Sequence, residues 1–112
     1  MTQVTAAALV AENRVLANPA STGSITTSGN KEDFVSMGMT AALKLQDVVK
    51  NTGLVLAIEA LAANRALDFL RPLKTSAALE GVRERLPRIE GDQPLTDAIT
   101  RVAELIAEGA LV

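Results

Sequence analysis

The sequence contains no cysteine and no histidine, and each absence removes a class of chemistry. Without cysteine there is no disulfide framework and no thiolate metal site, which leaves the compartment open but favours the cytoplasm. Without histidine, the chain itself can supply no Ser-His-Asp triad, no histidine general base and no histidine-ligated zinc. We therefore expect no metal site in this chain.

Aromatic residues are also scarce, since the 112 residues include two phenylalanines, no tryptophan and no tyrosine. Nucleic acid bases would find almost nothing to stack on, and 11 basic against 13 acidic residues leave a net charge of -2, so no nucleic acid partner is expected. The most apolar run, residues 53–63, is interrupted by Glu59 and is shorter than the roughly 20 residues that cross a bilayer. No membrane partner is expected, and the core must be aliphatic.

The residues that are present predict helices separated by one polar loop. Apolar side chains recur at helical spacing over residues 1–17, and Asn18-Pro19 ends that helix because proline disfavours the helical conformation of the residue before it. Residues 18–31 are rich in serine, threonine and glycine. They predict either an ordinary solvated loop or a loop whose backbone approaches a ligand closely.

Residues 32–71 predict one long core helix, with Asn30 as its N-cap and with Glu32 and Asp33 in a first turn where the helix dipole favours negative charge. At about 1.5 Å per residue, such a helix would be about 55 Å long, which exceeds a compact domain of this size. Its apolar residues point in most directions around the axis. A helix of this kind belongs inside a larger bundle, so its partners are expected from other segments or other subunits.

Two short amphipathic helices are expected within residues 75–109, at 76–86 with Thr75 as its N-cap and at 94–109, beginning after Asp92. The charged residues on these helices are expected to form a solvated face: Arg83, Glu84, Arg85 and Arg101. The predicted fold class is therefore all-α, a long core helix plus shorter helices that together form a fragment of a large, mostly helical bundle.

Several motifs, taken in order, resemble the carboxyl-terminal part of histidine ammonia-lyases, within the family of aromatic amino acid lyases and aminomutases. The motifs are TAAALVAEN (5–13), NPAS (18–21), SI (24–25), TS (27–28), EDFVSMG (32–38), LAIE (56–59), ALD (66–68) and PLK (72–74). Their combined order is far more specific than any single short pattern. The resemblance covers roughly the whole chain and is densest in its first seventy residues.

The resemblance implies a homotetrameric, almost entirely helical enzyme that acts on an aromatic amino acid. Such enzymes use a methylidene-imidazolone (MIO) electrophile, formed from an internal Ala-Ser-Gly tripeptide that lies upstream of the region matched here. This chain contains no Ala-Ser-Gly, and it has no tyrosine to match the family's catalytic tyrosine. Thr27-Ser28-Gly29 is superficially similar, but it falls where the family has loop residues. We therefore expect the remainder of the lyase to supply the electrophile, and the isolated chain to be inactive.

Glu32 is the residue to which the resemblance assigns catalysis and substrate binding. Histidine-specific members carry glutamate at the matching position, whereas phenylalanine and tyrosine lyases carry glutamine. A carboxylate accepts hydrogen bonds from an imidazole and favours its cationic form, while a neutral amide suits an uncharged ring. The alternative is that Glu32 only stabilises the start of a helix. Asp33, beside it, is expected to be structural.

Lys31 is a second candidate for substrate binding, with a solvent-facing cap as the alternative. The chain departs from the usual histidine lyase pattern at four positions. Lys31 replaces glutamine, Phe34 replaces histidine, and Gly23 and Thr26 replace aspartate and proline of the loop. The lysine beside Glu32 opposes a cationic substrate ring, which keeps phenylalanine and tyrosine open as substrates.

The sequence thus predicts part of an ammonia-lyase that converts L-histidine to urocanate, with residues 18–31 as an active-site loop. The first alternative is part of a phenylalanine or tyrosine ammonia-lyase or aminomutase. The second is a helical assembly module without catalytic activity that associates with complete subunits.

Overall fold

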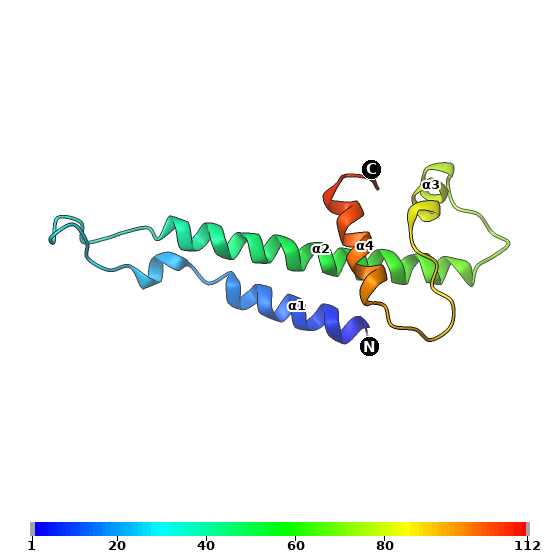
Figure 1. Cartoon of the computed structure of the whole chain (residues 1–112), viewed down its shortest axis with the longest axis horizontal. Coiled ribbons are helices and arrows are strands. Elements are labelled where there is room, and N and C mark those ends of the chain that lie inside the picture. Colours follow the sequence, from blue (N-terminus) through cyan, green and yellow to red (C-terminus); the bar gives the residue numbers. More distant parts are fainter. Residues whose placement is uncertain (1, 112) are drawn as a thin grey trace. The chain divides into compact units, whose positions relative to one another are not determined.

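A computed structural model describes residues 2–111, which form helices joined by loops (Figure 1). The elements in chain order are α1 (Thr2–Leu16), the short 3₁₀ helix η1 (Ala20–Gly23), α2 (Gly38–Asp68), α3 (Ala77–Arg85) and α4 (Thr96–Ala107). Extended pairing within the described residues is limited to one antiparallel bridge between Thr27 and Glu32. The predicted all-α class, with one long helix and several shorter ones, is confirmed.

Contacts within the chain divide it into two compact units. The first, called the loop unit below, comprises residues 7–52 and contains most of α1, the following loop and the first half of α2. The second, called the helical unit, comprises the described residues 2–6 and 53–111 and contains the second half of α2 with α3 and α4.

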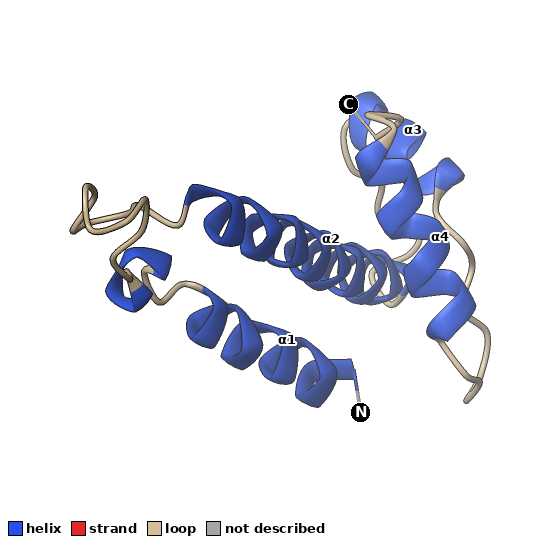
Figure 2. Ribbon diagram, turned by 60° about the vertical axis from the view of Figure 1, so that its left-hand side comes forward, coloured by secondary structure: helices blue, strands red, loops and turns tan. Residues whose placement is uncertain are grey.

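In the loop unit, α1 and the first half of α2 run side by side in opposite directions (Figure 2). A buried amide joins them: Asn51 Nδ2 donates to Glu12 Oε2 at 3.0 Å and to Asn13 Oδ1 at 3.1 Å. Asn13 Nδ2 in turn donates to Thr52 Oγ1 at 3.3 Å. Asn51, at 8% exposed, is the one buried side chain among residues 7–52, so polar bonds rather than an apolar core fix the register of the two helices.

Large apolar side chains of the loop unit lie at its surface instead. They are Val10, Val15, Ile25, Phe34, Met39, Leu43, Leu45 and Val49, each at least 39% exposed. A helix with apolar residues on several sides is stable only when other helices cover them. This surface is what the sequence predicts for a helix that belongs to a larger bundle.

The helical unit has an aliphatic core between the second half of α2 and the later elements. Its buried members are Ala57, Ile58, Leu61, Leu86, Val102 and Leu105. The apolar stripe of α4 supplies Val102 and Leu105 to this core, and Ile99 and Ile106 pack against it. The predicted amphipathic character of this helix therefore explains how it docks.

Arg83 ties α3 to the end of α2. Its Nε donates to Asn64 Oδ1 at 2.8 Å and its Nη2 donates to Asp68 Oδ1 at 2.7 Å. A third bond runs from Nη1 to Glu80 Oε1 at 3.3 Å. The expectation that Arg83 belongs to a solvated face is wrong, because its side chain is only 7% exposed and a guanidinium can leave water where carboxylate and amide oxygens replace it.

Glu80 also closes the start of α3, where the N-cap is Ser76 rather than the predicted Thr75. Ser76 Oγ accepts from Leu79 N at 3.3 Å, while Thr75 donates from both Oγ1 (2.7 Å) and N (3.1 Å) to Glu80 Oε1. The hydroxyl bond from Thr75, its backbone bond and the nearby Arg83 charge lower the pKa of Glu80 to about 2.

The predicted long helix at 32–71 is too long at both ends, since α2 begins at Gly38 and ends at Asp68. Asn30 is not its N-cap. Ser28, Gly29 and Asn30 all have left-handed φ angles (55°, 62° and 66°), which turn the chain back on itself before any helix can start.

Other helix boundaries differ less from the expectation. Helix α1 agrees with the predicted segment to within a residue. Helix α4 begins at Thr96, after an N-cap at Leu95 that makes no side-chain capping bond. The predicted start at Pro94, after Asp92, is therefore two residues too early.

We expect Arg83→Ala to destabilise the attachment of α3 by about 2 kcal/mol, because it leaves two carboxylates and an amide without their shared charged donor. The measurements are thermal unfolding and hydrogen exchange of the α3 amides. Arg101→Ala is the matched control: Arg101 is 56% exposed and, among the described residues, pairs only with Glu104 at 3.3 Å, so a loss below about 0.5 kcal/mol is expected. Equal effects of the two substitutions would contradict the role given to Arg83.

Glu80 should make stability depend on acid pH. Its pKa in the folded chain, about 2, lies below the ordinary value of 4.5, so its contribution is fully present above pH 4.5 and is lost as the pH falls toward 2. The difference in thermal midpoint between the unaltered chain and Glu80→Gln should therefore shrink as the pH is lowered through this window. Glu84→Gln, at an exposed position of the same helix, should show no such trend; a difference independent of pH for Glu80→Gln would contradict the assignment.

Candidate functional site

Glu32 lies directly after a tight turn in the loop between α1 and α2. Its backbone pairs with Thr27 in both directions, through Thr27 N to Glu32 O at 3.0 Å and Glu32 N to Thr27 O at 3.4 Å. The turn between them is closed by Lys31 N donating to Ser28 O at 3.3 Å. These bonds fix the backbone of Glu32 at the base of a short hairpin.

The sequence of this turn suits its left-handed backbone. Gly29 carries no Cβ, and a Cβ added there would meet nothing within 4 Å, so only its φ of 62° restricts the residue type. Asn30 belongs to the residue types that adopt such angles most readily. Ser28 does so less readily, and it is held there because its carbonyl oxygen accepts the bond that closes the turn.

The chain leaving the hairpin is held at two further points. Val35 N donates to Ser24 Oγ at 2.7 Å, across 11 residues of sequence. Met37 has a φ of 54° and its carbonyl oxygen accepts from Ala41 N at 3.1 Å, so it forms the entry to α2. A left-handed angle is unusual for a residue with a long side chain and marks a constrained position. The abundance of serine and threonine signalled polar ties of this kind, but no sequence signal identified Met37.

The side chain of Glu32 is exposed, and its carboxylate has no hydrogen bond or ion pair with any residue in the described range 2–111. The alternative that Glu32 stabilises a helix start is wrong, because α2 begins six residues later. Lys31 and Asp33 are exposed beside it, and Phe34 is 66% exposed. The structure thus presents a basic and two acidic side chains together on one hairpin, all available to outside groups.

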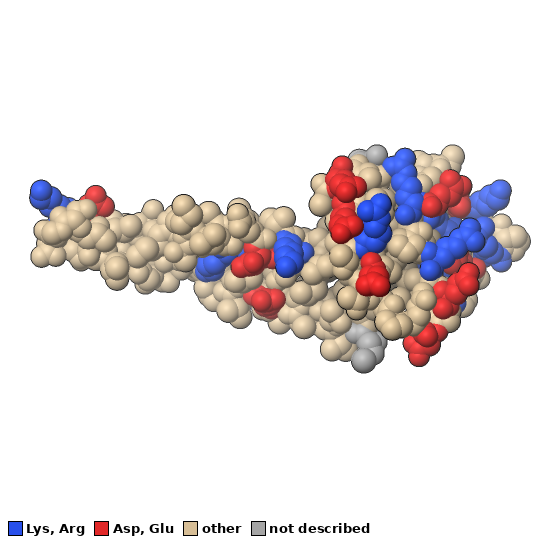
Figure 3. All heavy atoms as spheres, in the orientation of Figure 1, with Lys and Arg blue, Asp and Glu red and all other residues tan. Residues whose placement is uncertain are grey.

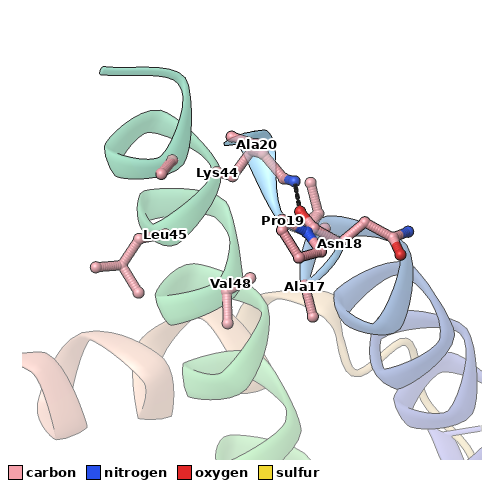
Figure 4. Close-up of a pocket in the computed structure, with 9 residues that line it drawn as sticks. Ala17, Asn18, Pro19, Ala20, Lys44, Leu45 and Val48 are labelled. Carbon is pink, nitrogen blue, oxygen red and sulfur yellow. Dashed lines mark hydrogen bonds between the residues drawn. The ribbon is translucent and has the colours of Figure 1, made fainter. Parts of the chain in front are cut away.

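A separate, largely apolar cavity of about 300 Å³ lies within the loop unit (Figure 4). It is lined by Leu16, Ala17, Asn18, Pro19, Ala20, Ala41, Lys44, Leu45 and Val48. Lys44 extends from α2 across its rim and donates from Nζ to the carbonyl oxygen of Asn18. Glu32 does not line this cavity, so the cavity gives no support to substrate binding at Glu32.

The helical unit contains a polar cavity of about 780 Å³ around the Arg83 network. Its lining carries both signs of charge, with the basic residues Arg71, Lys74 and Arg88 and the acidic residues Glu84 and Glu90. Charged groups gather over this unit, whereas the visible face at the start of α2 is nearly free of them (Figure 3). The ion pairs in this lining join Asp68 to Arg65, Arg71 and Arg83, and Glu80 to Arg83, so they belong to the attachment of α3 and the end of α2.

Within residues 2–111, no three side chains of the metal-binding types come together. The same residues contain no helix that combines the length and the apolar character needed to cross a membrane. Thr27-Ser28-Gly29, the nearest match to an Ala-Ser-Gly tripeptide, lies in the exposed hairpin, where both backbone groups of Thr27 pair with Glu32. The described chain therefore offers no fitting source for a methylidene-imidazolone group.

Comparison with known proteins gives a consistent result. The profile of the aromatic amino acid lyase family matches residues 1–88. A histidine ammonia-lyase of Koribacter versatilis is 61% identical over 115 residues, which cover 99% of this chain and 22% of that protein. One from Symbiobacterium thermophilum is 50% identical and covers 100% of this chain and 23% of its own length.

The fold agrees with a solved structure as well. The crystal structure of histidine ammonia-lyase from Trypanosoma cruzi matches with a TM-score of 0.89 at 43% identity, over 96% of this chain and 22% of that one. The chain thus spans about 22% of the length of the relatives that it matches. The family profile, the sequence identity and the fold together show that the chain belongs to the aromatic amino acid lyase family.

Proposed function

We propose that this chain forms one wall of the active site of a histidine ammonia-lyase, which eliminates ammonia from L-histidine to give urocanate. The observation that carries the proposal is Glu32: a carboxylate without a partner among residues 2–111, fixed at its backbone by a hairpin, in a chain 61% identical to a histidine ammonia-lyase. The 61% and 50% identity to two histidine ammonia-lyases supports histidine as the substrate over other aromatic amino acids.

Glu32 would bind and orient the substrate ring. An ionised carboxylate accepts an N–H of the imidazole and favours the ring's cationic form, and a hydrogen bond between charged groups is roughly twice as strong as a neutral one. Lys31, adjacent and exposed, supplies a positive charge for the carboxylate of the amino acid. Positioning of this kind lowers the barrier because the reacting groups no longer have to be aligned during the reaction.

The MIO electrophile of the family has no Ala-Ser-Gly precursor among the 112 residues of this chain. In the proposed enzyme it comes from another part of the lyase, where it supplies the electron-withdrawing group for ammonia loss. The part played by this chain is confined to binding and orienting the substrate beside it.

We further propose that the chain works within a homotetramer in the cytoplasm. The exposed apolar side chains along the first half of α2, among them Met39, Leu43 and Val49, support association with other helices. Between 55% and 75% of each of these three side chains is exposed, a degree that favours burial in an assembly. The absence of cysteine is compatible with a reducing compartment.

A phenylalanine or tyrosine ammonia-lyase or aminomutase is the second candidate. The observation that favours it is the charge of Lys31, which lies next to Glu32 on the same exposed hairpin and opposes a cationic ring. The substitution below distinguishes the two candidates.

In the complete enzyme, Glu32→Gln should lower kcat/KM for histidine by about tenfold to a hundredfold, since it removes a charge-assisted hydrogen bond of about 1.5–3 kcal/mol. Activity toward phenylalanine should rise relative to histidine, because a neutral amide suits a benzene ring. The matched control is Asp33→Asn, which removes the same charge from the next residue and should leave the preference unchanged. An unaltered preference in Glu32→Gln would refute the role of Glu32.

The isolated chain should release no ammonia from histidine, because it lacks both the electrophile precursor and the catalytic tyrosine. Its exposed apolar helix surface should also make it aggregate or elute as a large oligomer in size-exclusion chromatography. A compact, cooperatively melting monomer would favour an assembly module without catalytic activity. Ammonia release by the purified chain alone would contradict the proposal.

A further inference from the structure

We propose that Ser24 is a positioning residue for Glu32, acting through its hydrogen bond to the backbone of Val35. The inference rests on the proposed function of Glu32 and adds a residue to that site. The loop around the hairpin has two arms: an incoming arm of residues 24–27 and an outgoing arm of residues 32–37. Ser24 stands at the start of the first, and its Oγ lies 2.7 Å from Val35 N in the second.

Among the described residues, hydrogen bonds join these arms at two places. One is the backbone pairing of Thr27 with Glu32 next to the turn, and the other is the bond from Val35 N to Ser24 Oγ. Glu32 takes part in the backbone pairing and lies three residues before Val35, the donor of the second hydrogen bond. Hydrogen bonds at both places fix the position and the direction of the outgoing arm, whereas bonds at one place would leave its direction free.

Apolar packing does not replace these bonds. Ile25 in the incoming arm is 63% exposed and Phe34 in the outgoing arm is 66% exposed, and both arms belong to a unit whose one buried side chain is Asn51. Ser24 and Val35 themselves are half-buried, so water replaces a lost bond less readily there than at the surface. The hydroxyl of Ser24 is therefore the one side-chain group seen to hold the arms together in the described chain.

Loss of this hydroxyl should move the carboxylate of Glu32 without unfolding the chain. Ser24 belongs to no α-helix and lies outside the aliphatic core of the helical unit, so the helices keep their own contacts. Catalytic geometry is more sensitive than folding, because a displacement of about 1 Å can cost about a hundredfold in rate.

The experiment compares three variants of the complete lyase: Ser24→Ala, Ser24→Thr and Ser36→Ala. Ser24→Ala removes the acceptor and should lower kcat/KM for histidine by about tenfold, with most of the loss in kcat. Ser24→Thr keeps an Oγ and should restore most of the activity. Ser36→Ala is the matched control, since Ser36 lies exposed in the same outgoing arm and its hydroxyl has no hydrogen bond within residues 2–111. Unchanged kinetics in Ser24→Ala would overturn the inference.

A double variant shows whether Ser24 acts through Glu32. If it does, Ser24→Ala should cost much less in the Glu32→Gln background than in the unaltered enzyme, because the carboxylate that it positions is already gone. An equal loss in both backgrounds would mean a general structural role and would refute the inference even if Ser24→Ala lowers activity or stability. If Glu32→Gln leaves activity and substrate preference unchanged, the proposed function fails. If Glu32→Gln lowers activity but Ser24→Ala does not, only the positioning role of Ser24 is refuted.

Discussion

The constraint on which the rest of the structure depends is that α2, a helix of 31 residues, must cover apolar surface on several sides. Its second half meets this requirement within the chain, where Ala57 and Leu61 are buried against residues of the later helices. Its first half does not, since Met39 is 75% exposed and Leu43 is 55% exposed. The same helix therefore supports a local core in one unit and an uncovered apolar surface in the other.

The polar contacts of Asn51 matter because the loop unit lacks an apolar core. Hydrogen bonds are directional, so an amide that contacts both Glu12 and Asn13 fixes the register of α1 against α2 more strictly than sliding apolar surfaces would. That register determines where the loop leaves α1 and where it enters α2. The hairpin that carries Glu32 is thus set at its two ends by a buried amide far from it in sequence.

The sequence predicted the fold class and the helices well because helical periodicity and proline are local signals. It predicted the Ser/Thr/Gly loop because serine, threonine and glycine are local signals too. Glu32 as the candidate residue came from the family resemblance, and its role stays a prediction. It failed on the start of α2, because acidic residues after Asn30 are equally consistent with a helix start and with a hairpin. It also failed on Arg83, whose burial depends on oxygens from Asn64 and Asp68, 19 and 15 residues earlier in the chain.

The error at the start of α2 changes the chemistry assigned to Glu32. In the first turn of a helix, its carboxylate would already be stabilised by the positive end of the helix dipole and by free backbone amides. On the hairpin the amide of Glu32 itself is engaged, since Glu32 N donates to Thr27 O, and the carboxylate has no partner among the described residues. A carboxylate without internal compensation interacts more strongly with a cation brought to it. The left-handed turn at residues 28–30 therefore supports the proposed binding of a cationic ring better than a helix N-terminus would.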